Sequence, residues 1–430
     1  MTFGVFYNIV YSIIMNIIAY RERIVRDRVT RTIRNYPNPE CENMKIAVAA
    51  VVAAAVIIGF IPLFGGNNDV PRAALPDETA FTASPAPLNA ADCLALIDSG
   101  GNFIYEHNAS KRRGMASTTK IMTALVAIEN LNPDDVVKID KRAVGIEGSS
   151  VYLKEGEELS VSDLLYCLLL ESGNDAAAAI AIYCGGSIES FVDMMNAKAA
   201  ELGLKDTLFA NPHGLSDESH YTTAHDLALI TRAAMEYPLF CEIVSTKRKS
   251  APYLGDENGR ILVNHNKMLF NYPGTVGVKT GYTLRDGKCL VSACERDGLT
   301  LIAVTLNDPF PQATHKSLYE SAFERFAAVR VAEAGEIRVS VPLEDGEEAF
   351  AEAANPDDFV ITLPKGADYS IELTKITPVQ APVSKGERLA QAKVVVDGNT
   401  VGIIDLESLD DQPEHIYSLW EKLLGKRLDK

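Results

Sequence analysis

Residues 117–130, STTKIMTALVAIEN, are the stretch from which the fold can be worked out. Apolar residues recur in it at helical spacing, and Ser117 and Lys120 stand one turn apart at its start. A Ser and a Lys three residues apart in a helix share a face, so the hydroxyl and the amine lie side by side. The stretch therefore predicts a buried helix with a polar pair at its N-terminus.

On both sides of this helix, strand-like and helical patterns alternate. Strand-like runs lie at 95–97 and 301–304, and helical patterns extend over 162–183, 188–202 and 223–237. Strands at both ends with helices between them indicate an α/β (α+β) sandwich, in which a sheet is covered by a helical cluster. We expect this domain to occupy residues 90–332.

The pattern changes after Glu333. Short runs of alternating apolar and polar residues lie at 336–341, 359–363 and 369–373, and a last pair at 392–396 and 400–404 flanks Asp397-Gly398-Asn399. An Asp-Gly pair between two strand patterns is typical of a tight hairpin turn. Residues 333–410 are therefore expected to form a small all-β domain.

The N-terminal region has the features of an export signal. Residues 1–43 form a basic extension, an apolar run at 46–64 is long enough to span a bilayer, and residues 65–89 form a Pro-rich linker. Positive charge ahead of an apolar run predicts export of the chain beyond that run, so we expect residues 44–64 to be a signal peptide or a signal anchor. Because Met44 can itself serve as a start, residues 1–43 are either translated or an over-extended reading frame.

The C-terminal residues 411–430 are expected to form an amphipathic helix. Its apolar residues, among them Trp420, lie near one face, and its lysines and arginine lie largely elsewhere. Such a helix either lies in a membrane interface or docks on its own β domain, and the sequence favours neither.

Charge and cysteine content exclude several classes of protein. The chain has 430 residues and a formal net charge of −17, which argues against a nucleic-acid partner because phosphates require a basic surface. Seven cysteines are too few for a disulfide-dense scaffold. None forms a C-x-x-C pair or lies three to five residues from a histidine, so we expect no metal site and mainly buried free thiols.

The first of three short motifs is the S-x-x-K formed by Ser117 and Lys120. This pattern is expected about twice by chance in a chain of this length, so alone it is a weak signal. It occurs once, at a helix start, where free backbone N–H groups can stabilise an oxyanion.

The other two motifs lie further along the chain. Ser172-Gly173-Asn174 interrupts a helical pattern, and alone it indicates a helix break with capping side chains. Lys279-Thr280-Gly281 lies among residues that favour a strand, and alone it indicates an ordinary strand with one exposed lysine.

Together and in this order, the three motifs resemble those of the serine penicillin-binding enzymes. More specifically, the chain is similar to the low-molecular-mass D-alanyl-D-alanine carboxypeptidases of peptidoglycan, the peptidase S11 family. The resemblance extends over the stretches 148–153, 162–165, 174–176, 211–215 and 220–228, and covers the chain from about residue 85 to its end. It implies a β-lactamase/transpeptidase-like serine-hydrolase domain with a trailing β domain, acting at the extracytoplasmic face of the bacterial cell membrane.

The resemblance also implies an acyl-enzyme mechanism. Ser117 is expected to attack the carbonyl between the last two D-alanines of a peptidoglycan stem peptide and to release D-alanine. Neutral Lys120 is the expected base, because burial and a second cation, Lys279, lower the pKa of an amine. Ser172 is expected to relay a proton to the leaving amine, and Asn174 to orient Lys120 or the substrate amide.

Substrate binding is expected to involve the third motif. Lys279 and Thr280 would bind the terminal carboxylate, and Gly281 would let the substrate backbone approach closely. By the family resemblance, the backbone N–H groups of Ser117 and Tyr282 would form the oxyanion hole. β-Lactams are expected as covalent inhibitors, with no cofactor and no metal.

Two other functions are weighed against this one. A β-lactamase acylates the same serine, but class A enzymes use an additional Glu for deacylation, and Glu189 and Glu201 lack the Glu-x-x-Leu-Asn context of that residue. A non-catalytic penicillin-binding scaffold is disfavoured by the intact Ser117, Lys120 and Lys279.

Three histidines, His213, His220 and His225, cluster along the sequence. Ser–Lys chemistry needs no histidine, and the H-E-x-x-H spacing of a zinc site is absent. We therefore expect structural roles for all three.

Overall fold

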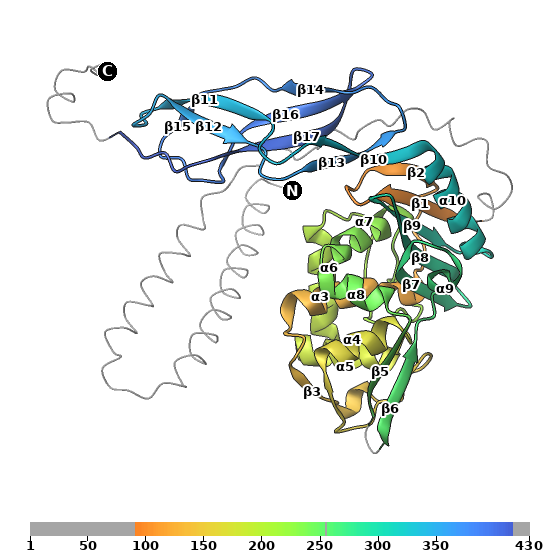
Figure 1. The fold of residues 1–430 in the computed structure, drawn as a ribbon. Coiled ribbons are helices and arrows are strands. Elements are labelled where there is room, and N and C mark those ends of the chain that lie inside the picture. Colours follow the sequence, from red (N-terminus) through yellow and green to blue (C-terminus); the bar gives the residue numbers. More distant parts are fainter. Residues whose placement is uncertain (1–90, 254–255, 416–430) are drawn as a thin grey trace, which may run out of the picture. The chain divides into compact units, whose positions relative to one another are not determined.

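An antiparallel sheet of five strands, in the order β2-β1-β9-β8-β7, forms the centre of the first domain (Figure 1). The computed structural model describes residues 91–253 and 256–415. The strands are β1 (Cys93–Asp98), β2 (Phe103–His107), β7 (Thr275–Thr283), β8 (Gly287–Arg296) and β9 (Leu299–Leu306). Strands from both ends of the domain therefore meet in one sheet, as the sequence predicts.

Both faces of this sheet are covered. Along β1, Cys93, Ala95 and Ile97 belong to one buried cluster and Leu94 and Leu96 to another. Successive side chains of a strand point to opposite faces, so the continuous apolar run of β1 reflects burial on both sides. The helical cluster covers the first face, and α10 (Pro311–Arg325) covers the second (Figure 1).

The helical cluster is built around α3 (Lys120–Asn130), which follows the short 3-10 turn η3 (Ala116–Thr119). Residues 120–127 of α3 are all buried, because this helix contacts its neighbours on every side. Those neighbours are α4 (Val161–Leu169), α5 (Asn174–Gly185), α6 (Ile188–Glu201), α7 (Ala224–Met235) and α8 (Pro238–Ser245). The side chains of Ser160, Ser187 and Thr223 cap α4, α6 and α7.

The prediction of one continuous helix over 162–183 is wrong. The pattern over 162–183 is divided into α4 and α5, and the four residues between them include Ser172 with φ of +61°. This left-handed conformation cannot continue an α-helix, and it places the second motif in the break. The helices predicted over 188–202 and 223–237 are confirmed to within two residues at each end.

Smaller elements complete this domain. They are β3 (Val136–Lys138), η4 (Lys141–Ala143), β4 (Glu158–Ser160), the hairpin of β5 (Arg248–Tyr253) and β6 (Asp256–Val263), and α9 (Met268–Asn271). The strands β3 and β4 pair with each other, as do β5 and β6.

The remainder of the described chain is all-β. It contains a sheet in the order β14-β16-β17-β12-β11-β15 and a pair of β10 (Phe326–Ala332) with β13 (Phe359–Pro364). The six-stranded sheet comprises β11 (Arg338–Glu344), β12 (Phe350–Ala354), β14 (Ser370–Leu373), β15 (Val379–Gln380), β16 (Arg388–Val396) and β17 (Asn399–Ser408). The predicted hairpin is confirmed: Val396 pairs with Asn399, and Asp397 and Gly398 between them have φ of 50° and 78°.

Several predicted segments lie outside the described residues: the extension 1–43, the signal segment 44–64, the linker 65–89 and residues 416–430 of the predicted C-terminal helix. The start predicted for that helix at residue 411 is wrong, because Gln412 and Glu414 form β-bridges with Val383 and Gly346. Within the two described ranges, no helix combines the length and the apolar character needed to cross a bilayer.

Candidate active site

Ser117 lies half-buried in η3, at the point where the chain enters α3. The backbone around it is closely packed. A Cβ built on Gly281 of β7 would lie 2.9 Å from the backbone nitrogen of Ser117, and one built on Gly214 would overlap the carbonyl of Ala116. The sequence predicts that Gly281 admits a substrate, and the structure shows that it also allows β7 to lie against the Ser117 amide. The first and third motifs are therefore in direct contact.

Lys120 occupies the centre of the site and is fully buried. Its Nζ lies 3.1 Å from Ser117 Oγ, 2.7 Å from Asn174 Oδ1 and 2.5 Å from the carbonyl oxygen of His213. Burial lowers the pKa of Lys120 well below its ordinary value, and the nearby charge of Lys279 lowers that pKa further. This cluster joins the first two motifs, and burial favours the neutral form of the amine at its centre.

Lys279 is the second buried amine of the site, on β7. Its Nζ donates a hydrogen bond to the carbonyl of Thr280, at 2.9 Å. Burial lowers the pKa of Lys279 to about 7, against the opposing effect of Glu171. An anion placed beside this amine would stabilise its charged form, so the position suits a carboxylate. Thr280 is half-buried, and Tyr282 is exposed.

The second motif contributes two side chains of different character. Asn174 is held on both sides, because its Nδ2 donates to the carbonyl of Glu147 at 2.5 Å while its Oδ1 accepts from Lys120. A Cβ on Gly148 would lie 2.8 Å from that Nδ2, so a glycine is required there. Ser172, in contrast, is only 3% exposed, and its Oγ has no hydrogen-bond partner among the described residues. A buried hydroxyl without a partner is uncommon and leaves a donor available to a bound molecule.

Asp175 is a residue of the site that none of the three motifs includes. It is buried, and its carboxyl group accepts hydrogen bonds from the N–H groups of Val151 and Leu153 and from the hydroxyl of Ser150. These bonds fix the loop before β4 against the start of α5, and the same loop supplies the carbonyl that orients Asn174. The signals in the sequence are the position of Asp175 directly after the second motif and its place in the stretch 174–176, which shares the family resemblance.

The histidines do not form a catalytic or metal-binding cluster. His220 Nδ1 accepts from the N–H of Ala210, so its Nε2 carries the proton and donates to Thr119 Oγ1 at 2.7 Å; burial lowers the pKa of His220 to about 4. His225 stacks on an aromatic ring of β2. His213 contributes its backbone carbonyl to Lys120, a role that no side-chain pattern reveals. No group of His, Cys, Asp and Glu suited to a metal ion occurs in the part of the chain that the structure describes.

The cysteines in the described ranges are all free. Cys93, Cys167, Cys289 and Cys294 are buried, and Cys184 and Cys241 are partly buried. For these six residues, the prediction of mainly buried free thiols is confirmed.

Comparisons with known proteins show the family of this chain. A family model described as D-alanyl-D-alanine carboxypeptidase matches residues 79–309, and one described as penicillin-binding protein 5, C-terminal domain, matches residues 326–414. The chain is 30% identical over 381 residues to D-alanyl-D-alanine carboxypeptidase DacF of Bacillus subtilis, which covers 86% of this chain and 95% of that protein. It is 30% identical over 348 residues to D-alanyl-D-alanine carboxypeptidase DacA of Escherichia coli, covering 75% of this chain and 84% of that protein.

A solved structure of a penicillin-binding protein is also similar to this chain. Penicillin-binding protein 5 from Haemophilus influenzae superposes with a TM-score of 0.65 at 27% identity, covering 77% of this chain and 99% of that one. The predicted fold class and enzyme class are thereby confirmed. With its first domain and its β domain both matched, the chain belongs to the family of D-alanyl-D-alanine carboxypeptidases.

Proposed function

We propose that this protein removes the terminal D-alanine from peptidoglycan stem pentapeptides through an acyl-enzyme on Ser117, and that β-lactams inhibit it by acylating the same serine. One observation carries the proposal. The buried amine of Lys120 lies 3.1 Å from Ser117 Oγ and is held by two carbonyl-type oxygens, Asn174 Oδ1 and the backbone oxygen of His213.

The hydrogen bonds of Lys120 explain how it acts as a base. A neutral amine has two N–H donors and one lone pair. The two donors are used by Asn174 and His213, so the lone pair is directed at the hydroxyl of Ser117, which then donates to Nζ. As the hydroxyl oxygen attacks the peptide carbonyl, its proton passes to Lys120. Burial lowers the pKa of Lys120, which favours the neutral form of this amine.

Expulsion of D-alanine requires a proton on the leaving amine. Ser172 is suited to deliver it, because its buried hydroxyl bonds to no group in the described part of the chain. We infer that this proton comes from Lys120 by way of Ser172. Asn174 would meanwhile hold Lys120 in place.

The third motif supplies substrate recognition in this proposal. Lys279 and Thr280 would bind the terminal carboxylate, which distinguishes a chain end from an internal peptide bond. The N–H groups of Ser117 and Tyr282 would stabilise the oxyanion. The support is that β7 lies against the Ser117 amide at Gly281, one residue before Tyr282.

A substrate in the cell wall places the reaction outside the cytoplasm. We propose that residues 44–64 direct export as a signal peptide or an anchor, and that residues 411–430 contact the membrane surface. Sedimentation of residues 86–430 and 86–410 with lipid vesicles tests the second point, because both chains lack the N-terminal segment. Equal membrane association of both would exclude a role for the C-terminal segment.

The test of the activity is D-alanine release from diacyl-Lys-D-Ala-D-Ala by the purified protein. We expect release by the wild type, none by Ser117→Ala, and normal release by the control Ser190→Ala, which alters an exposed serine of α6. Penicillin then separates the alternatives. Rapid hydrolysis of penicillin would indicate a β-lactamase, and a stable adduct without peptide hydrolysis would indicate a scaffold.

A further inference from the structure

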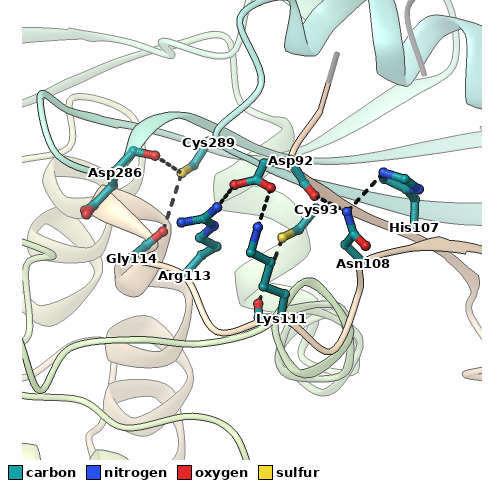
Figure 2. A network of polar contacts seen from close by, with 9 residues as sticks. All are labelled: Asp92, Cys93, His107, Asn108, Lys111, Arg113, Gly114, Asp286 and Cys289. Atoms are coloured by element: carbon teal, nitrogen blue, oxygen red, sulfur yellow. Dashed lines mark hydrogen bonds and ion pairs between the residues drawn. The ribbon is translucent and has the colours of Figure 1, made fainter. Parts of the chain in front are cut away.

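Asp286 lies in the turn between β7 and β8, outside all three motifs, with 9% of its surface exposed. Its carboxyl group packs directly on Gly114, where any Cβ would overlap Oδ1. Figure 2 shows the two residues beside the thiol of Cys289, which contacts the backbone carbonyls of both. The carboxyl group of Asp286 can therefore occupy this position only because residue 114 is a glycine.

The hydrogen bonds of Asp286 reach the turn that carries Ser117. Oδ2 accepts from the backbone N–H of Ala116 at 3.2 Å, and it also lies 3.3 Å from the hydroxyl of Ser216. The backbone N–H of Asp286 donates to Thr283 Oγ1 at 2.9 Å, and the hydroxyl of Ser216 lies 3.0 Å from the same Oγ1.

These contacts join three segments of the candidate site. The first is the turn before α3, the second is the loop whose His213 carbonyl binds Lys120, and the third is the end of β7 after Gly281. Asp286 is the residue in which hydrogen bonds to all three converge.

Ala116 needs such support because of its conformation. Its φ is +46°, in the left-handed region that alanine rarely adopts. It is also fully buried, so its backbone N–H would lack a partner if Asp286 were absent. A change in this φ would move Ser117, the next residue, relative to Lys120.

We propose that Asp286 is a positioning residue for acylation: its Oδ2 holds Ala116 in the left-handed conformation that sets Ser117 beside Lys120, and Gly114 is the glycine that makes room for it. The inference rests on the proposed function of Ser117. It predicts that the acceptor oxygen of residue 286 matters for the rate at which Ser117 is acylated.

The test follows acylation by a fluorescent penicillin in the intact protein, together with thermal unfolding. We expect Asp286→Ala to lower the second-order rate of acylation by about tenfold to a hundredfold, because small misplacements of a reacting group have effects of this size. The final amount of adduct should equal that of the wild type. Asp286→Asn, which keeps an acceptor oxygen, should stay within about threefold of the wild type. The control Glu295→Ala, an exposed residue at the other end of β8, should have no effect.

A second pair of variants tests the role of Gly114. Gly114→Ala alone should slow acylation at least as much as Asp286→Ala, because the new methyl group overlaps the carboxyl group. In the double variant Gly114→Ala/Asp286→Ala the overlap is gone, so acylation should be no slower than in Asp286→Ala alone.

The outcomes separate this inference from the function on which it rests. If Ser117→Ala still forms the adduct, the proposed function fails. If Ser117→Ala is inert but Asp286→Ala reacts at the wild-type rate, only the role of Asp286 is excluded. If Asp286→Asn is as slow as Asp286→Ala, the hydrogen bond that residue 286 accepts from Ala116 does not set the rate of acylation. This conclusion holds whether or not the two variants keep the wild-type melting temperature.

Discussion

Two buried clusters on opposite faces of the same sheet each place a serine hydroxyl beside a nitrogen base. In the candidate site the pair is Ser117 and Lys120. In the other cluster, between β8 and α10, Ser292 Oγ lies 2.6 Å from His315 Nδ1 and 2.8 Å from the hydroxyl of Tyr319.

The two clusters differ in how completely their polar groups are paired. In the second cluster the remaining nitrogen of His315 contacts Thr305 Oγ1 at 3.0 Å, and all four side chains are fully buried. Burial lowers the pKa of His315 to about 3, so this base stays neutral and has no accessible substrate. The candidate site instead keeps an unpaired hydroxyl, Ser172, and a half-buried Ser117. The candidate site thus differs from the second cluster in having an unpaired hydroxyl and a partly exposed serine.

Removal of the base from the candidate site should lower D-alanine release more than a change at Ser172, Lys279 or Ser292. Lys120→Ala leaves Ser117 without a proton acceptor, so D-alanine release should fall by about a thousandfold or more, within the range of general-base effects. Initial rates with diacyl-Lys-D-Ala-D-Ala measure it. Retention of more than about a tenth of the activity would contradict the role of Lys120.

Loss of the unpaired hydroxyl should have the next largest effect. Ser172→Ala should lower kcat by about a hundredfold, because the proton relay to the leaving amine is lost. It should not lower the free energy of unfolding, since within 91–253 and 256–415 this hydroxyl leaves no hydrogen-bond partner behind. A variant that lost stability but kept its kcat would show that Ser172 is structural.

Lys279 should contribute to substrate binding and to the pH dependence of KM. Lys279→Met removes a charged partner of the carboxylate, so kcat/KM should fall by about tenfold to a hundredfold. A substrate with a C-terminal amide should be cleaved poorly by both forms.

The sign of the pH effect follows from the lowered pKa. Lys279 is charged below pH 7 and neutral above it, so KM in the wild type should rise as the pH increases through about 7. This rise should be absent in Lys279→Met. Stability increases with pH while substrate binding weakens: above pH 7 the unfolded chain binds the proton that folded Lys279 has lost, so this residue makes the free energy of unfolding increase with pH. A KM that is flat from pH 6 to 9 in the wild type would contradict the assignment.

The smallest effect on activity should come from the second cluster. Ser292→Ala leaves His315 and Tyr319 with unpaired polar atoms, so the free energy of unfolding should fall by about 1–3 kcal/mol. D-Alanine release by the folded protein should be unchanged. Chemical unfolding curves and initial rates together test this, and a large loss of kcat without a loss of stability would assign this cluster to the reaction.

The comparison also shows which features a sequence reveals. The three motifs are short, and S-x-x-K is brought together within a single helical turn, so their residues could be identified directly. The apolar face of α10 is less regular, because Thr314 and His315 are buried on it beside Leu318 and Tyr319. Periodicity therefore did not identify this helix.

The missing parts of the site depend on atoms that carry no side-chain signal. The carbonyl of His213 binds Lys120, and the backbone N–H of Ala116 binds Asp286, although any residue has these groups. Such contacts are set by the tertiary packing of segments that lie far apart along the chain. The contact between Gly281 and the Ser117 amide is also set by tertiary packing. From the sequence, this glycine is explained only by the approach of the substrate backbone.

The close packing around Ala116 has a consequence for drug resistance. Gly114, Gly214 and Gly281 bring backbone and carboxyl atoms so near this turn that no larger residue fits without moving it. In the proposed function, peptide and β-lactam both react with Ser117, so substitutions here would slow acylation by the drug and by the substrate together. Selection for a penicillin-tolerant form of this protein should therefore act on exposed side chains outside this packing, such as Leu284.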